Sequence, residues 1–89
     1  MEYAIENEYL IVTVTTWGAQ GKSVVRKFDD VEHMWQADKS VWGYHAPILF
    51  PHTGKVVDDL IETKGEVYQA KQHGFARLME HTLVRQTED

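Results

Sequence analysis

Apolar and polar residues alternate near the start of the chain. Within residues 9–16, every second residue from Leu10 to Val14 is apolar, and β-branched residues fill most of the other positions. This period of two predicts a β-strand, because successive side chains of a strand point to opposite faces. The Asn7-Glu8 pair just before it predicts a tight turn, with residues 3–6 as the partner strand.

Two further extended segments follow the first pair. Gly18 and Gly21 predict a break in the chain, and residues 23–28 predict the next short strand. The Asp29-Asp30 pair predicts a turn, after which residues 31–35 resume an extended conformation. Together these segments indicate a meander of antiparallel strands.

The middle of the chain loses this alternation. Asp38 is a suitable N-cap for one short helical turn that reaches Trp42. Pro47 and Pro51 then bracket the apolar residues 48–50. Proline fixes its own φ and favours extended conformations in the residue before it, so this segment should be extended and irregular.

The remaining pattern predicts a hairpin and one more strand. Residues 60–63 and 66–69 flank a turn in which Gly65 supplies a positive φ. Residues 75–86 suit either helical or strand spacing, and the all-β context favours a strand. We therefore expect a single domain over residues 1–89, with an all-β fold class and an antiparallel β-sandwich architecture.

Composition and charge exclude several classes of function. The formal net charge of −5 argues against a nucleic-acid partner, because phosphate binding needs clustered Lys and Arg. The absence of cysteine excludes disulfides, thiolate catalysis and Cys-based zinc sites. No signal peptide or long apolar run is present, so we expect no membrane partner and a cytoplasmic location.

Most clusters of polar residues have an ordinary structural explanation. The five histidines do not form a zinc-helix pattern, and we expect no metal. The adjacent carboxylates at 29–30 and 58–59 suit solvated turns better than a pair facing across a substrate. Trp42, with Trp35 nearby, would suit either stacking on a sugar or covering an apolar core.

The string His73-Gly74-Phe75-Ala76-Arg77 is the most unusual in the sequence. Glycine permits close backbone approach, so a ligand would be able to come near the His and Arg side chains. The same pair on the rim of a loop would also suit a plain surface feature. The residues alone leave both interpretations open.

The order of these features resembles the aldose 1-epimerase (galactose mutarotase) family, and most closely its bacterial branch associated with lactose operons. The shared features are Trp35, Trp42-Gly43, residues 46–51, Gly54-Lys55, the Gly65 hairpin with Tyr68, and the His73–Arg77 string. The resemblance implies the N-terminal part of a galactose-mutarotase-like β-supersandwich. It also implies interconversion of the α and β anomers of an aldose, without a cofactor.

The resemblance also assigns roles to three residues. His73 matches the family's first active-site histidine, which implies catalysis and substrate binding near the sugar ring. Arg77 matches the arginine of the same family string and is expected to line the site. Lys55 falls where the family usually has a substrate-binding arginine, and lysine keeps the charge but loses the bidentate fork.

Family members are considerably longer than this chain, and no glutamate here matches the family's catalytic base. We therefore expect a fragment that binds a sugar such as galactose or glucose and is a poor catalyst alone. A fragment of a β-sandwich has strand edges without pairing partners, and such edges should favour self-association. Two alternatives stay open: a hexose-6-phosphate 1-epimerase relative in which Lys55 and Arg77 clamp a phosphate, and a non-catalytic carbohydrate-binding or interaction module.

Overall fold

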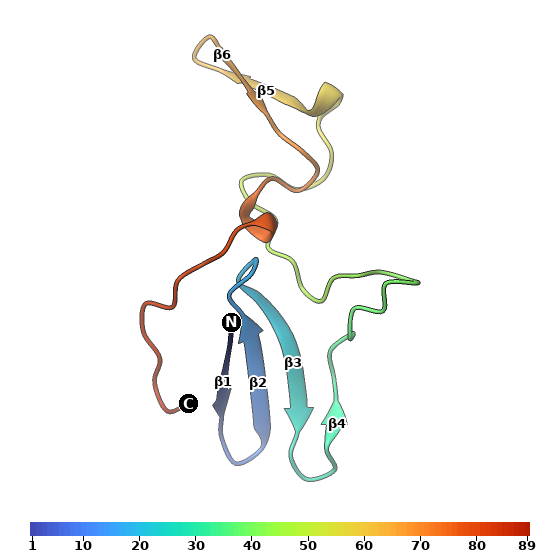
Figure 1. Ribbon diagram of the computed structural model, residues 1–89, viewed down its shortest axis with the longest axis vertical. Helices are drawn as coiled ribbons and strands as arrows, with labels where there is room; N and C mark the ends of the chain where they lie inside the picture. The colour runs from blue at the N-terminus through green and yellow to red at the C-terminus, as the bar shows by residue number, and fades with distance from the viewer.

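Four consecutive strands form an antiparallel meander in the computed structural model, which describes residues 1–89 (Figure 1). The strands pair in the order β1-β2-β3-β4. Their bounds are β1 (Glu2–Glu6), β2 (Leu10–Thr15), β3 (Gln20–Arg26) and β4 (Val31–Glu32). The predicted meander is confirmed, although β4 is shorter than the extended segment expected at 31–35.

The turn between β1 and β2 depends on Asn7. Its side-chain oxygen accepts hydrogen bonds from the backbone N–H groups of Tyr9 at 2.8 Å and Leu10 at 2.9 Å. Short polar side chains stabilise turns in this way, by bonding to the backbone two or three residues on. The resulting register places Ile5 opposite Val12, so apolar side chains of neighbouring strands meet on one face.

The break expected after Trp17 is confirmed as a turn, but it ends before Gly21, because β3 begins at Gln20 and includes this glycine. Thr13 pairs with Ser23 and Val14 pairs with Gly21, so Lys22 is an extra residue without a partner. This is a β-bulge, which lets a strand continue through a local irregularity. Gly18, with a φ of 72°, marks the turn that precedes the strand.

The second sheet is the predicted hairpin of β5 (Leu60–Thr63) and β6 (Glu66–Gln69), which follows the short 3-10 helix η1 (Val57–Asp59). Lys64 and Gly65 form the two-residue turn, with φ values of 51° and 78°. Two positive φ values match the right-handed twist of the flanking strands. The hairpin prediction is therefore confirmed, including its turn.

The middle segment makes one helical turn, as predicted. The backbone N–H of Trp42 donates to the carbonyl oxygen of Asp38 at 2.8 Å. The Asp38 side chain accepts from the N–H of Ser40 at 2.9 Å, which is the expected N-cap interaction. The chain is irregular from there to η1.

The strand predicted over residues 75–86 is wrong. Ala76–Leu78 form the 3-10 helix η2, and the remaining residues have no regular secondary structure. Gly18 N–H donates to Met79 O at 2.7 Å, and His81 N–H donates to Thr16 O at 2.9 Å. The backbone of this segment thus bonds to a turn, and strand pairing stops at the single bridge between Trp17 and Glu80.

Phe50 connects the hairpin region to η2. Its carbonyl oxygen accepts from the N–H groups of Phe75 at 2.9 Å and Ala76 at 3.3 Å. Phe50 and Gly74 form an isolated parallel bridge. A Cβ atom at Gly74 would lie 2.1 Å from the Phe50 carbonyl oxygen, so this close approach requires glycine.

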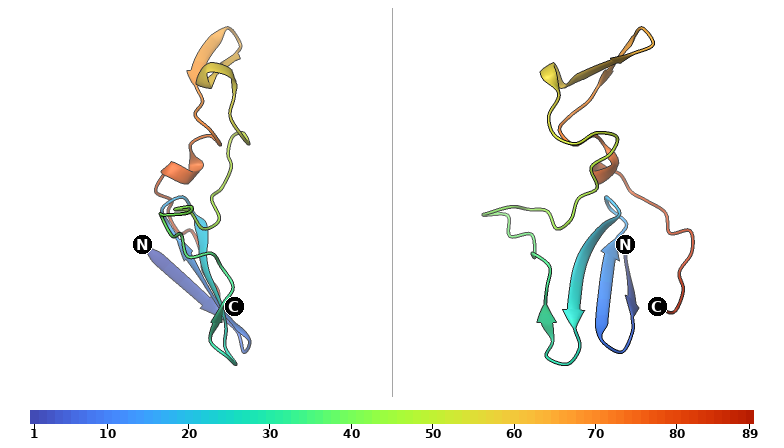
Figure 2. Two further views of the ribbon diagram at one scale, coloured as in Figure 1. Left: turned by 90° about the vertical axis from the view of Figure 1, so that its right-hand side faces the viewer. Right: turned by 180° about the vertical axis from the view of Figure 1, so that it is seen from behind.

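The two sheets lie along the longest axis of a thin molecule (Figures 1 and 2). The principal extents are 54 × 34 × 17 Å. Because the thinnest dimension is close to one sheet layer, only six of the 89 residues are buried. Most apolar side chains therefore keep substantial contact with solvent. The structure contains no helix of the length and apolar character that crossing a membrane requires.

Candidate functional site

His73 is held in an unusual backbone conformation, with a φ of 63°. Few residues other than glycine adopt this left-handed region. Two hydrogen bonds to Gly54 hold it there. The His73 N–H donates to Gly54 O at 2.9 Å, and the Gly54 N–H donates to Nδ1 of the His73 ring at 2.8 Å. Both the backbone and the half-buried ring of His73 are thus fixed.

Arg77 lies on η2, four residues after His73. One of its terminal nitrogens, Nη2, donates to Gln72 O at 3.1 Å. The guanidinium carbon lies 5.1 Å from the centre of the Tyr44 ring, which is within the range of a cation–π interaction. These two contacts orient the guanidinium across the gap between η2 and the loop that carries Tyr44.

Trp42 and Tyr44 form an aromatic pair on that loop, with ring centres 6.0 Å apart and planes inclined by 45°. The loop is attached to the four-stranded sheet through Gln20. Its side-chain oxygen accepts from the N–H groups of His45 at 3.3 Å and Ala46 at 3.2 Å. Gln20 is only 8% exposed, so this acceptor is shielded from water. The sheet therefore positions the aromatic pair.

These elements line an open cavity of about 480 Å³, which we call the His73 cavity. It has aromatic, apolar, amide, imidazole and guanidinium groups in its walls. The lining residues are Trp42, Tyr44, Pro47, Leu49, Gln72, His73 and Arg77. Mostly apolar walls with a few convergent polar groups are typical of small-molecule sites. Arg77 is the one charged residue among them.

The structure places His73 and Arg77 together, and Lys55 apart from them. Lys55 follows Gly54 directly, but its side chain does not line the His73 cavity. Its Nζ instead pairs with the Asp59 carboxylate at 2.8 Å. Both side chains of this ion pair are largely exposed, so the pair itself contributes little to stability.

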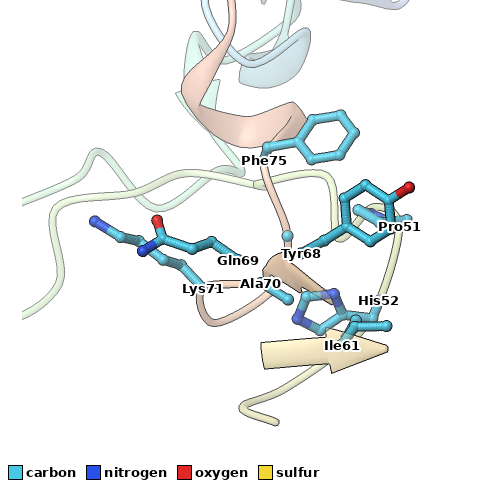
Figure 3. Close-up of a pocket in the computed structure, with 9 residues that line it drawn as sticks. Pro51, His52, Ile61, Tyr68, Gln69, Ala70, Lys71 and Phe75 are labelled. Atoms are coloured by element: carbon cyan, nitrogen blue, oxygen red, sulfur yellow. The ribbon is translucent and has the colours of Figure 1, made fainter. Parts of the chain in front are cut away.

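A second cavity of about 290 Å³ lies on the other side of the same segment, between the hairpin and η2 (Figure 3). We call it the His52 cavity; its walls include His52, Ile61, Tyr68 and Phe75. Both ring nitrogens of His52 are buried without a hydrogen-bond partner. Tyr68 donates its hydroxyl to Glu66, and this hydrogen bond raises the pKa of Tyr68.

No group of three or more His, Asp or Glu side chains in residues 1–89 is arranged to hold a metal ion. The histidines considered as ligands lie in different surroundings. His45 bonds to the Trp35 carbonyl through Nδ1 at 2.8 Å, whereas His52 and His73 line separate cavities.

Sequence reasoning identified Trp42, His73 and Arg77 but missed Tyr44, Gln72 and the supporting role of Gln20. Tyr44 lies two residues after Trp42, a spacing that would have suggested a shared aromatic surface. No local signal distinguishes Gln20, because its partners are 25 and 26 residues away along the chain.

Comparison with known proteins supports the interpretation of this fold. No protein-family model matches the chain. The plasmid-encoded protein LacX of Lactococcus lactis subsp. lactis is 36% identical over 94 residues, which cover 100% of this chain and 31% of LacX. The chromosomal LacX of the same organism matches equally well. The chain therefore spans about a third of the length of these curated relatives.

Two solved structures match almost all of the chain. A galactose mutarotase related enzyme from Lactobacillus acidophilus is 41% identical, with a TM-score of 0.95 over 99% of this chain and 29% of its own. A galactose mutarotase-like protein from Lactobacillus casei is 35% identical, with a TM-score of 0.93 over 99% of this chain and 30% of its own. The resemblance to the galactose mutarotase-like proteins is confirmed. The predicted all-β, galactose-mutarotase-like fold class is confirmed with it.

Proposed function

We propose that the His73 cavity binds an aldose such as galactose or glucose. The observation that supports this most directly is the meeting of three kinds of group in one cavity. His73 and Arg77 come from one segment, and the Trp42–Tyr44 pair faces them from another. Aromatic faces pack against the C–H faces of a sugar, while imidazole and guanidinium groups donate hydrogen bonds to its oxygens. The similarity to galactose mutarotase-like proteins agrees with this ligand class.

We propose interconversion of anomers as the activity of a whole protein that contains this chain. In that reaction an acid protonates the ring oxygen while a base removes the proton of the anomeric hydroxyl. The seven residues lining the His73 cavity include no carboxylate, and this chain spans 31% of LacX. In this proposal, residues 1–89 position the sugar, with His73 as the group nearest to the chemistry, and are a poor catalyst alone.

A hexose-6-phosphate epimerase relative is the second candidate. It would use Lys55 and Arg77 together as a phosphate clamp. The Lys55 ammonium is paired with Asp59 and does not line the His73 cavity, which leaves Arg77 as the one cation there. A neutral sugar suits this arrangement better than a phosphorylated one. A non-catalytic carbohydrate-binding or interaction module would share the cavity but not the reaction.

An NMR titration distinguishes these candidates. Amide shifts of the ¹⁵N-labelled chain would be followed during addition of galactose, glucose or glucose 6-phosphate. We expect neutral sugars to shift residues 42–49 and 72–77 in the wild type and in Lys55→Met, but not in Arg77→Met. Shifts caused only by the phosphorylated sugar, and abolished by Lys55→Met, would favour the second candidate. Absence of saturable shifts with every sugar would refute sugar binding by this chain.

Polarimetry tests the catalytic part of the proposal. Freshly dissolved α-galactose would be followed with a high concentration of the chain and in buffer alone. We expect equal rates for residues 1–89 and a faster rate for a whole protein containing them. A whole protein that binds galactose without acceleration would instead be a carbohydrate-binding module. A cytoplasmic location belongs to the same proposal and is checked by cell fractionation.

A further inference from the structure

The hydrogen bond from Gly54 to His73 determines where the imidazole carries its proton. A backbone N–H is always a donor, so Nδ1, which receives the Gly54 N–H at 2.8 Å, must present a lone pair. A neutral imidazole has one N–H, and the hydrogen bond at one nitrogen fixes the proton on the other. The single proton of the His73 ring therefore lies on Nε2.

The surroundings of Nε2 leave this proton without a strong partner in the protein. The contact recorded at Nε2 is with the amide nitrogen of Gln72, at 3.5 Å, which is beyond the usual range of a hydrogen bond. An amide nitrogen donates and does not accept, so it cannot take the proton of His73 Nε2. His73 is half-buried and lines the His73 cavity. The ring thus presents a donor, and no acceptor, to whatever enters.

We infer that Gly54 is a positioning residue that makes His73 a neutral hydrogen-bond donor to an oxygen of the bound sugar. This inference rests on the proposed function and extends it. The oxygen that the Nε2–H approaches must offer a lone pair, as a ring oxygen or a hydroxyl does. Proton transfer to Nδ1 would place two N–H groups against each other, so His73 does not serve as the proton-accepting base of this site.

The backbone supports the same assignment. The His73 N–H donates to Gly54 O, while the Gly54 N–H donates to the His73 ring. The two residues are therefore joined by two hydrogen bonds. This contact opposes relaxation of the left-handed φ of 63° at His73. A ring fixed at Nδ1 and a backbone fixed at the same residue leave the direction of Nε2–H little freedom. Such fixed donors bind ligands with less loss of side-chain freedom.

The tautomer is directly measurable by long-range ¹H–¹⁵N correlation on the full 89-residue chain labelled with ¹⁵N-histidine. We expect His73 Nδ1 at the resonance position of an unprotonated nitrogen and Nε2 at that of a protonated one at pH 7. The reverse pattern, or protons on both nitrogens, would overturn the inference. This measurement needs no sugar, so its failure is distinct from failure of the proposed function.

Two substitutions test the role of the donor. Asn tolerates a left-handed φ and keeps an oxygen near the position of Nδ1, whereas Gln places an amide N–H near the position of Nε2. We expect His73→Asn to retain the wild-type amide spectrum outside the site and to weaken galactose binding about two- to tenfold, the effect of one hydrogen bond. His73→Gln should recover part of the loss. Unchanged affinity in His73→Asn, with affinity lost in Arg77→Met, would overturn the inference.

Discussion

The guanidinium of Arg77 lies against the face of Tyr44, with 5.1 Å between the guanidinium carbon and the ring centre. The two residues are far apart in the sequence, and their contact joins the aromatic loop to the segment that carries His73. A cation–π contact of this kind contributes roughly 0.5–1 kcal/mol at an exposed site. It therefore orients the charged wall of the His73 cavity.

We predict that Tyr44→Leu weakens galactose binding by about two- to fivefold, because the cation–π contact and one aromatic wall are lost together. Tyr44→Phe is the matched control, since it keeps the ring and removes only the hydroxyl. Its affinity should stay close to that of the wild type. The measurement is the dissociation constant from an NMR titration. Equal losses in both variants would show that the hydroxyl, rather than the ring, contributes the binding.

A glycine pair offers a matched test of the contact at Phe50. Gly74 and Gly65 have nearly the same φ, 75° and 78°, but a Cβ at Gly74 would lie 2.1 Å from Phe50 O whereas one at Gly65 meets nothing within 4 Å. We expect Gly65→Ala to lower the free energy of unfolding by about 1 kcal/mol. Gly74→Ala should lower it by about 3 kcal/mol or prevent folding.

Urea unfolding monitored by tryptophan fluorescence gives both values. Because the cost of the left-handed backbone is common to the two variants, their difference isolates the effect of crowding at Phe50. Similar stabilities for the two alanine variants would contradict the close approach of Gly74 and Phe50.

Gln20→Met should destabilise the aromatic loop. The substitution keeps the length of the side chain but removes the oxygen that accepts from His45 and Ala46. Leaving a buried N–H group without a partner costs about 1–3 kcal/mol. His45 is half-buried and Ala46 is exposed, so we expect a loss near the lower end of that range. Gln36→Met is the control, because Gln36 is exposed and donates only to the Lys22 and Met34 carbonyls.

Hydrogen exchange at residues 42–46, together with urea unfolding, measures this effect. We expect faster exchange in Gln20→Met and an unchanged pattern in Gln36→Met. Slow exchange in the loop of Gln20→Met would mean that the sheet does not hold the aromatic pair through Gln20.

Stability should fall in acid partly because of Glu32. Its carboxylate accepts from the Ser23 hydroxyl and from the N–H groups of Val24 at 2.8 Å and Met34 at 3.1 Å. These bonds, the one from Ser23 most of all, hold the pKa of Glu32 below its ordinary 4.5. A lowered pKa means that the stabilisation is complete above the unfolded-state pKa and is lost as the pH falls through the folded-state pKa.

We therefore expect Glu32→Gln and Ser23→Ala to have a lower free energy of unfolding than the wild type at pH 7. As the pH is lowered below about 5, the free energy of unfolding should fall less in these variants than in the wild type. Urea unfolding at several pH values checks this. Because the cause is mainly hydrogen bonding, 1 M NaCl should change the difference little. Parallel pH profiles for the wild type and Glu32→Gln would contradict the prediction.

Self-association is expected because the sheet is thin and few side chains are buried. Only six of 89 residues are buried, and Phe28 and Val57 are each 83% exposed. Exposed apolar faces and free strand edges favour contacts between chains. Light scattering should give a mass above 10.3 kDa at high protein concentration and a decrease on dilution. A monomer mass at every concentration would refute this prediction.

Local patterns were sufficient to predict much of this fold. The β1–β2 strands and the β5–β6 hairpin follow from alternation and from turn residues such as Asn7 and Gly65, whose effects act within a few residues. His73 and Arg77 share a cavity for a similar reason, because only four positions separate them. These features require no knowledge of distant contacts.

Other features depend on contacts between distant segments. Residues 75–86 have a strand-like composition, but their backbone hydrogen bonds to the first sheet are made at the turn Thr16–Gly18, which offers no continuous edge. The acceptor role of Gln20 likewise arises only when β3 and the aromatic loop come together.

The segment from Gln69 to Arg77 serves as a partition between the two cavities, with His73 on one side and Phe75 on the other. The Phe50 carbonyl oxygen holds this segment through the N–H groups of Phe75 and Ala76. We therefore expect a substitution at Phe75 that reshapes the His52 cavity also to shift the backbone that holds His73. Because this one segment forms part of the wall of both cavities, the effect of a variant made in either cavity must be measured in both.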